Sequence, residues 1–415
     1  MAPSGGSVDP GAPPRGQPSR GRWLGALPPQ VKLFGGVSLL NDFASEMIYP
    51  LLPAFVTGVL GAGPQALGAL DGAAEFAASV VKFAAGRLAD RPARRGPLIV
   101  LGYAIAVLVR PIIAVAAAAW QVIGLRVVDR VGKGIRTPPR DALMADITPA
   151  TLRGRAFGLQ RGMDHAGAVL GPLTAWRLLT SGSADVRAVI AWSLAPGVVV
   201  LVLATWAVKG GGGRWKAVEA NAGAVPPSPP STAFDRPRPP IPPALFAISA
   251  FYLLRMPETL LILRSQQLGV STAAVLLLWA ALHVVRSSAS FAGGRLTDRI
   301  GASRTMWLGW LAYAGVAAGF AVARGAGAAW TLFLAFGIVA GLTESPERTL
   351  VAQFAGGHQG SGFGMYHSVT GLAALAGGIG LGAVFQAYGA STAFRGSAVA
   401  GLALVLAWPL VARGR

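Results

Sequence analysis

GRLADR at residues 86–91 returns as GRLTDR at residues 294–299, and this repeat decides how the rest of the chain is interpreted. Further pairs keep this offset or nearly so: LGA at 60–62 with LGV at 268–270, GIRTPPRDALMA at 134–145 with GLTESPERTLVA at 341–352, and GRAFGLQRGMDHAG at 154–167 with GSGFGMYHSVTGLA at 360–373. Separate matches at one spacing indicate internal duplication. The chain is therefore expected to fold as two related halves.

The composition is typical of helical membrane proteins. Of 415 residues, 53% are hydrophobic and only 13% are charged, too few charges to cover the surface of a soluble protein of this length. Apolar runs of about 20 residues recur, long enough to cross a hydrocarbon layer ~30 Å thick. About twelve such helices with short loops would account for the length. The absence of cysteine excludes disulfides and thiolate metal sites.

Positive charge is concentrated in alternate short loops. The segments 86–95, 151–155 and 293–304 are basic, whereas the loops between them carry at most one arginine. Lys and Arg accumulate in the cytoplasmic loops of membrane proteins, which explains the formal net charge of +19 without a nucleic-acid partner. Both termini are therefore expected in the cytoplasm, which requires an even number of spans.

The sequence divides into five parts. Residues 1–30 and 209–243 are rich in Gly, Pro, Ser and Arg, and are expected to form a disordered cytoplasmic tail and a cytoplasmic linker. The N-terminal bundle covers 31–208, the C-terminal bundle 244–412, and a cytoplasmic C-terminus 413–415. Apolar segments are predicted at 33–60, 66–87, 97–118, 120–146, 156–180, 187–208, 244–267, 272–294, 304–323, 327–351, 360–386 and 394–412.

After the N-terminal tail, nearly the whole chain resembles the major facilitator superfamily. The loop between that family's second and third helices reads G-x-L-a-D-R-x-G-R-R, and this chain matches it except at Ala93, with Gly86, Leu88, Asp90, Arg91, Arg94 and Arg95. The resemblance implies an all-α membrane protein with twelve transmembrane helices. These would form two six-helix bundles, related by a pseudo-twofold repeat, around a central transport site.

The repeated loop motif is expected to hold the cytoplasmic side shut in one conformation. Glycine permits close helix packing, and the aspartate can bond arginine or helix ends across the interface between the halves. Arg140 and Glu347 align across the repeat with opposite charge, so Arg140, or Arg136 beside it, is expected to pair with Glu347 or Glu344 when this side closes. The gate candidates are Gly86, Asp90, Arg91, Arg140, Gly294, Asp298, Arg299 and Glu347.

GAVLGP at 167–172 is similar to the family's antiporter signature in helix 5. The matching residues are Gly167, Gly171 and Pro172, although Ala175 and Trp176 stand where two further glycines are expected. The resemblance favours an exporter. The alternative is helix packing through small residues, with a kink at the proline.

DRVGKGIRTPPRD at 129–141 places a dense charge cluster inside a predicted spanning helix. A charge at mid-bilayer costs about 2.5–3.5 kcal/mol, so these groups are expected to face water or each other rather than lipid. Two interpretations stay open: a cationic wall for an anionic substrate, and a structural salt-bridge network. Pro138 and Pro139 are predicted to break or bend the helix. The substrate-cavity candidates are Arg126, Asp129, Arg130, Lys133, Arg136, Arg255, Glu258 and Glu344.

Two pairs of acids are candidates for proton coupling. Asp42 and Glu46 are four residues apart, and Asp71 and Glu75 repeat that spacing, so each pair shares one helix face. A carboxyl group with little water around it can bind and release a proton near neutral pH. The alternative is permanent pairing with the cations of the 120–146 segment. Asp42 and Glu46 are preferred, because the family's first helix lines the cavity.

These patterns together predict a proton-coupled secondary transporter of the cytoplasmic (inner) membrane, exporting a small solute in exchange for protons. One alternative is uptake of an organic anion together with protons. An alternative of another class is a membrane-embedded transferase. We expect no enzymatic activity, no cofactor and no metal. The expected partners are a small-molecule substrate, protons and the lipid bilayer, with the protein acting as a monomer.

Overall fold

The computed structural model describes residues 27–89, 91–149, 152–209, 243–355 and 359–413. Nearly all of these residues are helical, and no strand occurs within these ranges. Asp90, most of the predicted N-terminal tail, most of the predicted linker and the last two residues lie outside the described residues.

The first half of the chain is a succession of helices at the positions of its predicted apolar segments. The first segment comprises α1 (Pro29–Ile48), the 3₁₀ turn η1 (Tyr49–Leu51) and the π-helix η2 (Ala54–Val59). After it come α2 (Pro64–Ala89), α3 (Pro92–Ile112) with η3 (Ile113–Val115), α4 (Ala119–Ile147), α5 (Arg153–Thr180), α6 (Val186–Trp192) and α7 (Leu194–Lys209).

The second half is built in the same way, with one interruption near its start and one near its end. It comprises α9 (Pro243–Leu254), α10 (Glu258–Gln267), α11 (Thr272–Ile300), α12 (Ala302–Val322), α13 (Gly325–Ala355) and α14 (Gln359–Arg413). Within α14 the helix is interrupted at Gly389, where φ is +81°. Glycine adopts that conformation without the steric penalty of a side chain, so the predicted segments 360–386 and 394–412 lie on either side of it.

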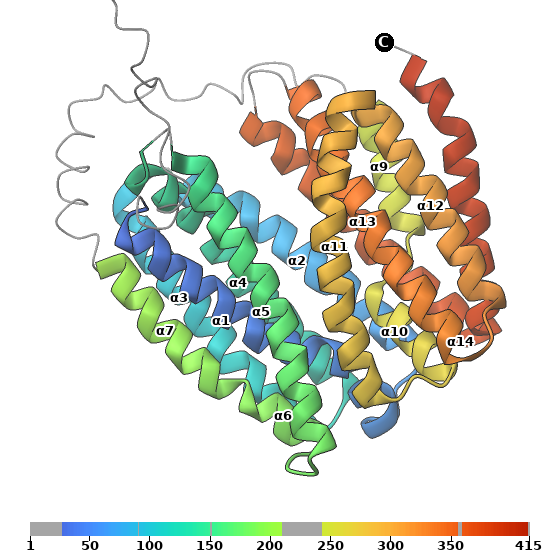
Figure 1. Cartoon of the computed structure of the whole chain (residues 1–415), viewed down its shortest axis with the longest axis horizontal. Coiled ribbons are helices and arrows are strands. Elements are labelled where there is room, and N and C mark those ends of the chain that lie inside the picture. Colours follow the sequence, from blue (N-terminus) through green and yellow to red (C-terminus); the bar gives the residue numbers. More distant parts are fainter. Residues whose placement is uncertain (1–26, 90, 150–151, 210–242, 356–358, 414–415) are drawn as a thin grey trace, which may run out of the picture.

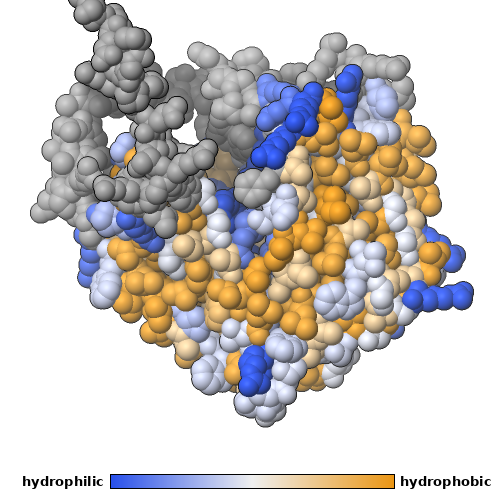
Figure 2. Space-filling model, viewed as in Figure 1, coloured by the Kyte–Doolittle hydropathy of each residue, from blue (hydrophilic) through white to orange (hydrophobic). Residues whose placement is uncertain are grey.

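Seven helical stretches in the described part of the chain are long and apolar enough to cross a membrane. They are Ala93–Val115, Val186–Lys209, Ala244–Gln267, Thr272–Ile300, Ala302–Val322, Gly325–Val351 and Gly364–Pro409. The visible flank of the molecule is largely hydrophobic (Figure 2). Large apolar side chains such as Leu108, Trp206 and Leu406 are exposed on the molecular surface. Such a surface suits a lipid environment.

The helices form two groups that meet along a central seam. Helices α1 and α3–α7 lie together in blue to green, and α9–α14 lie together in yellow to red (Figure 1). Helix α2 packs on α4 within the first group and on α14 of the second, while α5 packs on α11. These two inter-group pairs hold the halves side by side.

Glycines permit the closest approaches within and between the groups. A Cβ atom on Gly68 of α2 would collide with the carbonyl oxygen of Gly378 in α14, and the reverse is also true. A Cβ on Gly167 would collide with the carbonyl oxygen of Leu39, and one on Gly171 with that of Phe43. The glycines of the predicted helix 5 motif therefore pack α5 against α1, as small-residue packing predicts.

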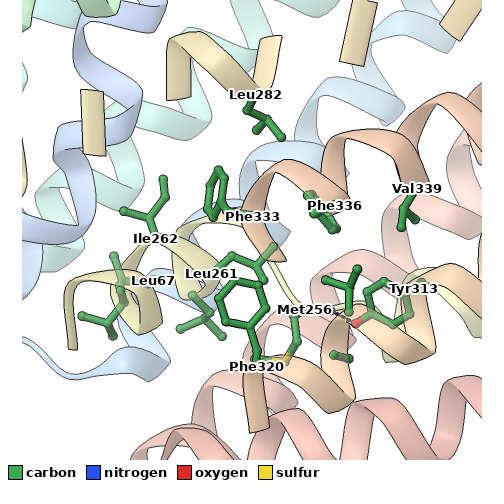
Figure 3. Packing of buried hydrophobic residues seen from close by; sticks show 14 of the residues in the cluster. Leu67, Met256, Leu261, Ile262, Leu282, Tyr313, Phe320, Phe333, Phe336 and Val339 are labelled. Atoms are coloured by element: carbon green, nitrogen blue, oxygen red, sulfur yellow. Dashed lines mark hydrogen bonds between the residues drawn. The ribbon is translucent and has the colours of Figure 1, made fainter. Parts of the chain in front are cut away.

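The break between α9 and α10 is satisfied by side chains of neighbouring helices. Residues 255–257 are non-helical, and Pro257 has no backbone N–H to continue a helix. The freed N–H of Met256 donates to the Tyr313 hydroxyl at 2.7 Å (Figure 3), and Ser397 Oγ donates to the carbonyl oxygen of Leu254 at 2.6 Å. The surrounding core is aromatic and aliphatic, with Phe320, Phe333, Phe336, Leu261 and Ile262 buried around it.

Helix α4 continues through Pro138 and Pro139, so the possibility of a helix break there is wrong. Its packing on neighbouring helices supports the continuous form. A Cβ on Gly132 would lie 2.8 Å from the Gly102 carbonyl oxygen of α3, and one on Gly134 would lie 2.8 Å from Val81 Cβ of α2. Both glycines precede the prolines, so these contacts hold the part of α4 before them, and the predicted bend at Pro138 and Pro139 stays a prediction.

Candidate functional site

A buried network of ions lies inside the first group of helices, centred on Asp129 of α4. Its Oδ1 accepts from Arg110 Nε at 2.9 Å, and its Oδ2 accepts from Arg126 Nη1 at 3.1 Å. All three residues are nearly inaccessible, at 4% exposure or less. Both carboxylate oxygens are therefore neutralised by guanidinium groups from two helices, the arrangement that makes a buried charge tolerable.

Asn41 of α1 extends this network to a third helix. Its Oδ1 accepts from Arg110 Nη1 at 3.2 Å and from Arg136 Nη2 at 3.1 Å, and its backbone oxygen also accepts from Arg110. The Arg136 guanidinium stacks over the Tyr103 ring at 4.6 Å. Of the predicted cavity residues, Arg126 and Asp129 are thus bound to each other, and Arg136 is joined to them through Asn41 and Arg110.

Arg130 and Lys133 differ from these buried neighbours. Both are only partly buried, and neither pairs with a carboxylate within the part of the chain that the structure describes. Asp129, Glu46 and Glu75 lie within electrostatic range of Arg130, and Asp42 and Glu75 within that of Lys133; Glu75 also lies within range of Lys82. These side chains form a cationic surface, drawn from α2 and α4, that is not neutralised by direct ion pairs.

Two of the predicted proton-coupling acids contact the second group of helices. Glu46 Oε2 accepts from Trp279 Nε1 of α11 at 2.9 Å and lies 3.8 Å from His283 Nε2. Asp71 accepts from the backbone N–H of Thr259 in α10 at 3.1 Å, and from its hydroxyl at 2.8 Å. Both acids therefore tie the two groups together.

The other two predicted acids make no such contact with the second group. Asp42 accepts from the side chain of Asn41 at 2.9 Å, beside the buried network. Glu75 is exposed and has no direct hydrogen bond or ion pair among the described residues. The two i, i+4 pairs therefore each have one member that bonds across the seam and one that does not.

The predicted cavity residues of the second group form a chain of ion pairs. Glu258 Oε1 accepts from Arg286 Nη2 at 2.7 Å and from Arg255 Nη2 at 3.2 Å, while Arg286 Nε lies 3.7 Å from Glu344 Oε1. The Arg255 guanidinium also lies over the Phe336 ring at 5.1 Å. Three predicted residues are thus brought together, joined by Arg286.

Among the described residues, no gate candidate of one half forms a hydrogen bond or ion pair with a gate candidate of the other. Arg140 pairs with its neighbour Asp141 at 3.0 Å, whereas Glu347 is buried and accepts hydrogen bonds from two tyrosines. Arg91, Asp298 and Arg299 are exposed, and Asp90 lies outside the described residues. Beside the first motif, Arg95 pairs with Asp146 of α4. A Cβ on Gly86 would meet nothing within 4 Å, and one on Gly294 would only touch Ser345 at 3.9 Å.

The hydrogen bonds that Glu46, Asp71, Thr259 and Gln65 make between the two groups lie toward one end of the seam. Besides those of Glu46 and Asp71, they join Thr259 Oγ1 to the Leu67 carbonyl oxygen at 3.2 Å and the Gln65 N–H to Gln386 Oε1 at 3.3 Å. Toward the side of the C-terminus, hydrophilic surface is recessed between the groups (Figure 2). The halves are tied together at the end opposite the basic loops.

Several residues of this site were missed by sequence reasoning. Arg110 is the one charged residue of the apolar segment 97–118, and Asn41, Thr259 and Trp279 resemble ordinary core residues. The one available signal was the isolation of Arg110 in an apolar helix, because such a charge needs a partner. Within the described ranges, no cluster of His, Asp and Glu could hold a metal ion.

Comparisons with known proteins agree with this architecture. The family model described as Major Facilitator Superfamily matches residues 34–378. An uncharacterized MFS-type transporter of Methanocaldococcus jannaschii is 27% identical over 354 residues, covering 84% of this chain and 86% of that one.

Two further similarities cover a shorter stretch or the fold alone. The multidrug resistance protein MdtH of Photorhabdus laumondii is 31% identical over 153 residues, 36% of this chain and 38% of its own. The solved structure of the nucleoside transporter NupG superposes with a TM-score of 0.70 at 14% identity, covering 94% of this chain and 100% of that one.

Proposed function

The chain belongs to the Major Facilitator Superfamily, and on that basis we propose that it is a proton-coupled secondary transporter that works by alternating access. Family membership makes it a transporter of small solutes rather than an enzyme. The observation that carries the proposal is the set of ionisable residues along the seam, some bonded across it and others free of direct pairing.

The proposed membrane arrangement has twelve spans in two six-helix bundles, residues 31–208 and 244–412. The 209–243 linker and both termini would lie in the cytoplasm. Support comes from the helices found at all twelve predicted segments and from Gly389, which separates the last two. The basic loops define the cytoplasmic face by the positive-inside rule.

With that orientation, the conformation would be open toward the cytoplasm beside the α2–α14 contact, which continues as far as Phe83 and Gly364. The bonds of Glu46, Asp71 and Gln65 to the second bundle close the opposite, outer end. Transport requires these bonds to break while the cytoplasmic ends approach each other. The exposed gate motifs at Arg91 and Asp298 would then come into contact, as would Arg140 and Glu347.

Export of the solute in exchange for protons is the primary proposal for direction. The local similarity to a multidrug resistance protein supports it. Among the four acids, Glu46 is the preferred proton carrier, because it bonds across the seam and faces His283. Protonation there would remove the charge that holds Trp279 and would loosen the outer contact.

A second candidate is the uptake of an organic anion together with protons. Arg130 and Lys133 favour it, because they are partly accessible cations without a direct ion pair among the described residues. A carboxylate or phosphate group on a solute would satisfy both of these donors. The two candidates differ in direction but share the membrane arrangement and the need for a proton carrier.

The substrate class is tested with a panel of small carboxylates, phosphate esters, amines and neutral sugars, scored by thermal stabilisation of the purified protein. We expect anions to stabilise it. Arg130→Gln and Lys133→Gln should each weaken that binding about ten- to a hundredfold, the equivalent of one charged hydrogen bond. Arg324→Gln, an exposed residue between α12 and α13, is the matched control and should bind as the wild type does.

Flux of the stabilising solute in proteoliposomes then separates the functional classes. An imposed pH gradient should drive the solute across the membrane. Movement of the solute against the direction of proton flow indicates antiport, and movement in the same direction indicates symport. Chemical turnover of the solute without any flux would instead support the transferase. If only neutral or cationic solutes stabilise the protein, and do so equally in Arg130→Gln and Lys133→Gln, the uptake of an organic anion is excluded.

A further inference from the structure

Glu347 of α13 lies in a buried cluster with two tyrosines from different helices. Its Oε2 accepts from the hydroxyl of Tyr366 in α14 at 2.9 Å and from that of Tyr252 in α9 at 3.1 Å. The two hydroxyl oxygens are 3.2 Å apart. Glu347 is only 3% exposed. Three helices of the second bundle therefore converge on this one carboxyl group.

This carboxyl group has no cationic partner. In the described part of the chain, no Lys, Arg or His nitrogen forms an ion pair with it. The charged groups within its electrostatic range are Arg255, at the end of α9, and Glu344, one turn away on α13. Arg255 is committed to Glu258 at 3.2 Å, and the neighbouring Arg348 is exposed.

The hydrogen-bond pattern fits a neutral carboxylic acid. Both tyrosine hydroxyls bond the same oxygen, Oε2, as two donors would approach a carbonyl oxygen with two lone pairs. Oε1 accepts no hydrogen bond among the described residues and is left for the proton. An ionised carboxylate buried with only neutral donors would be strongly disfavoured, whereas the neutral acid is readily accommodated.

We infer that Glu347 is a second proton-binding carboxyl group of the transporter and that it holds its proton in the conformation described here. This inference rests on the proposed function and extends it to the second bundle. On deprotonation the proton leaves to water, and the O–H electron pair stays on the carboxylate. Tyr252 lies within electrostatic range of Glu75 in the first bundle.

The position of Glu347 connects proton release to the contact between the bundles. A new negative charge would attract Arg255, the nearby cation, away from Glu258. Arg255 is in the non-helical break, and Glu258 and Thr259 begin α10 directly after it. Because Thr259 makes the bonds to Asp71, a shift of Arg255 reaches the outer contact along residues 255–259, across the start of α10 at Glu258.

Infrared spectroscopy of the full-length protein in lipid nanodiscs tests the inference directly. At neutral pH we expect a C=O stretching band of a protonated carboxylic acid, which disappears in Glu347→Gln and persists in Glu344→Gln. Glu344 is the matched control, since it is on the same helix but exposed and close to Arg286. The same band in the wild type and in Glu347→Gln would overturn the inference.

Tyr366→Phe provides an independent test should Glu347→Gln fail to fold. Removing one donor to Oε2 should shift the carboxylic-acid band to higher frequency, because a less hydrogen-bonded C=O is stiffer. An unchanged band in Tyr366→Phe would also overturn the assignment. Neither infrared measurement uses a solute, so a failure of the Glu347 assignment leaves the transport proposal intact. Conversely, if no proton-driven flux were found, the transport proposal would fail while the carboxylic-acid band of Glu347 could still be observed.

Discussion

Asp129→Asn is expected to destabilise the protein by about 3–5 kcal/mol, the cost of removing one partner from a buried ion pair. Asp129 neutralises Arg110 and Arg126, which would both stay buried without their counter-charge. Asparagine retains the shape and one acceptor oxygen but not the negative charge. The unfolding free energy, measured by titrating the purified protein with SDS in mixed micelles, should report this loss.

Asp141→Asn is the matched control, because it removes a carboxylate from the same helix. Its side chain is 42% exposed and pairs with Arg140 near the surface. A pair of that kind contributes about 1 kcal/mol or less. Equal unfolding free energies of the two variants would show that the network around Asp129 is open to water. Arg126, Asp129 and Arg136 would then line the substrate cavity, as the sequence predicts.

Glu46→Gln is expected to abolish transport driven by a pH gradient. Glutamine can still accept the hydrogen bond from Trp279, so the outer contact keeps its geometry, but the amide binds no proton at physiological pH. The measurement is uptake, into proteoliposomes with an imposed pH gradient, of the solute that stabilises the protein.

Counterflow of the same solute provides the internal control. Exchange of labelled for unlabelled solute needs no net proton movement, so it should survive in Glu46→Gln. Asp42→Asn, combined with Glu46→Gln, removes both acids of that helix face. Full pH-driven uptake by this double variant would exclude α1 from proton coupling and leave Glu347 as the stronger candidate.

The sequence predicts the extents of the helices well, because lipid-spanning length and apolar runs are local properties. The predicted segment 120–146 corresponds to α4 at Ala119–Ile147, and 304–323 corresponds to α12 at Ala302–Val322. The two prolines of α4 show the limit of local rules. Helix α4 stays continuous through Pro138 and Pro139, against the usual preference of proline to break a helix.

The sequence predicts which residues belong to the candidate site better than it predicts how they pair. Residue types and helix faces are local, so the charge cluster of α4 and the acids of α1 and α2 stand out. Pairing depends on packing between distant segments. Arg126 and Arg130 are four residues apart, yet one is buried against Asp129 and the other is partly accessible. Likewise, no local pattern connects Glu347 with Tyr252 and Tyr366, which come from two other helices.

The central claim is that the two bundles alternate between opening toward the cytoplasm and opening toward the outside. The absence of natural cysteine allows spin labels to be placed at chosen sites only. An inner pair, Gly158→Cys with Ala292→Cys, and an outer pair, Arg177→Cys with Gln267→Cys, use exposed positions on α5, α10 and α11.

Double electron–electron resonance gives the distance between the two spin labels of each pair. Measured in lipid nanodiscs at acidic and alkaline pH, these distances test whether the two bundles alternate. Proton-coupled alternating access predicts opposite changes: when the outer distance lengthens, the inner distance shortens, and Glu46→Gln reduces the pH response of both. Distances that change in the same sense, or that stay constant over the whole pH range, would contradict proton-coupled alternating access.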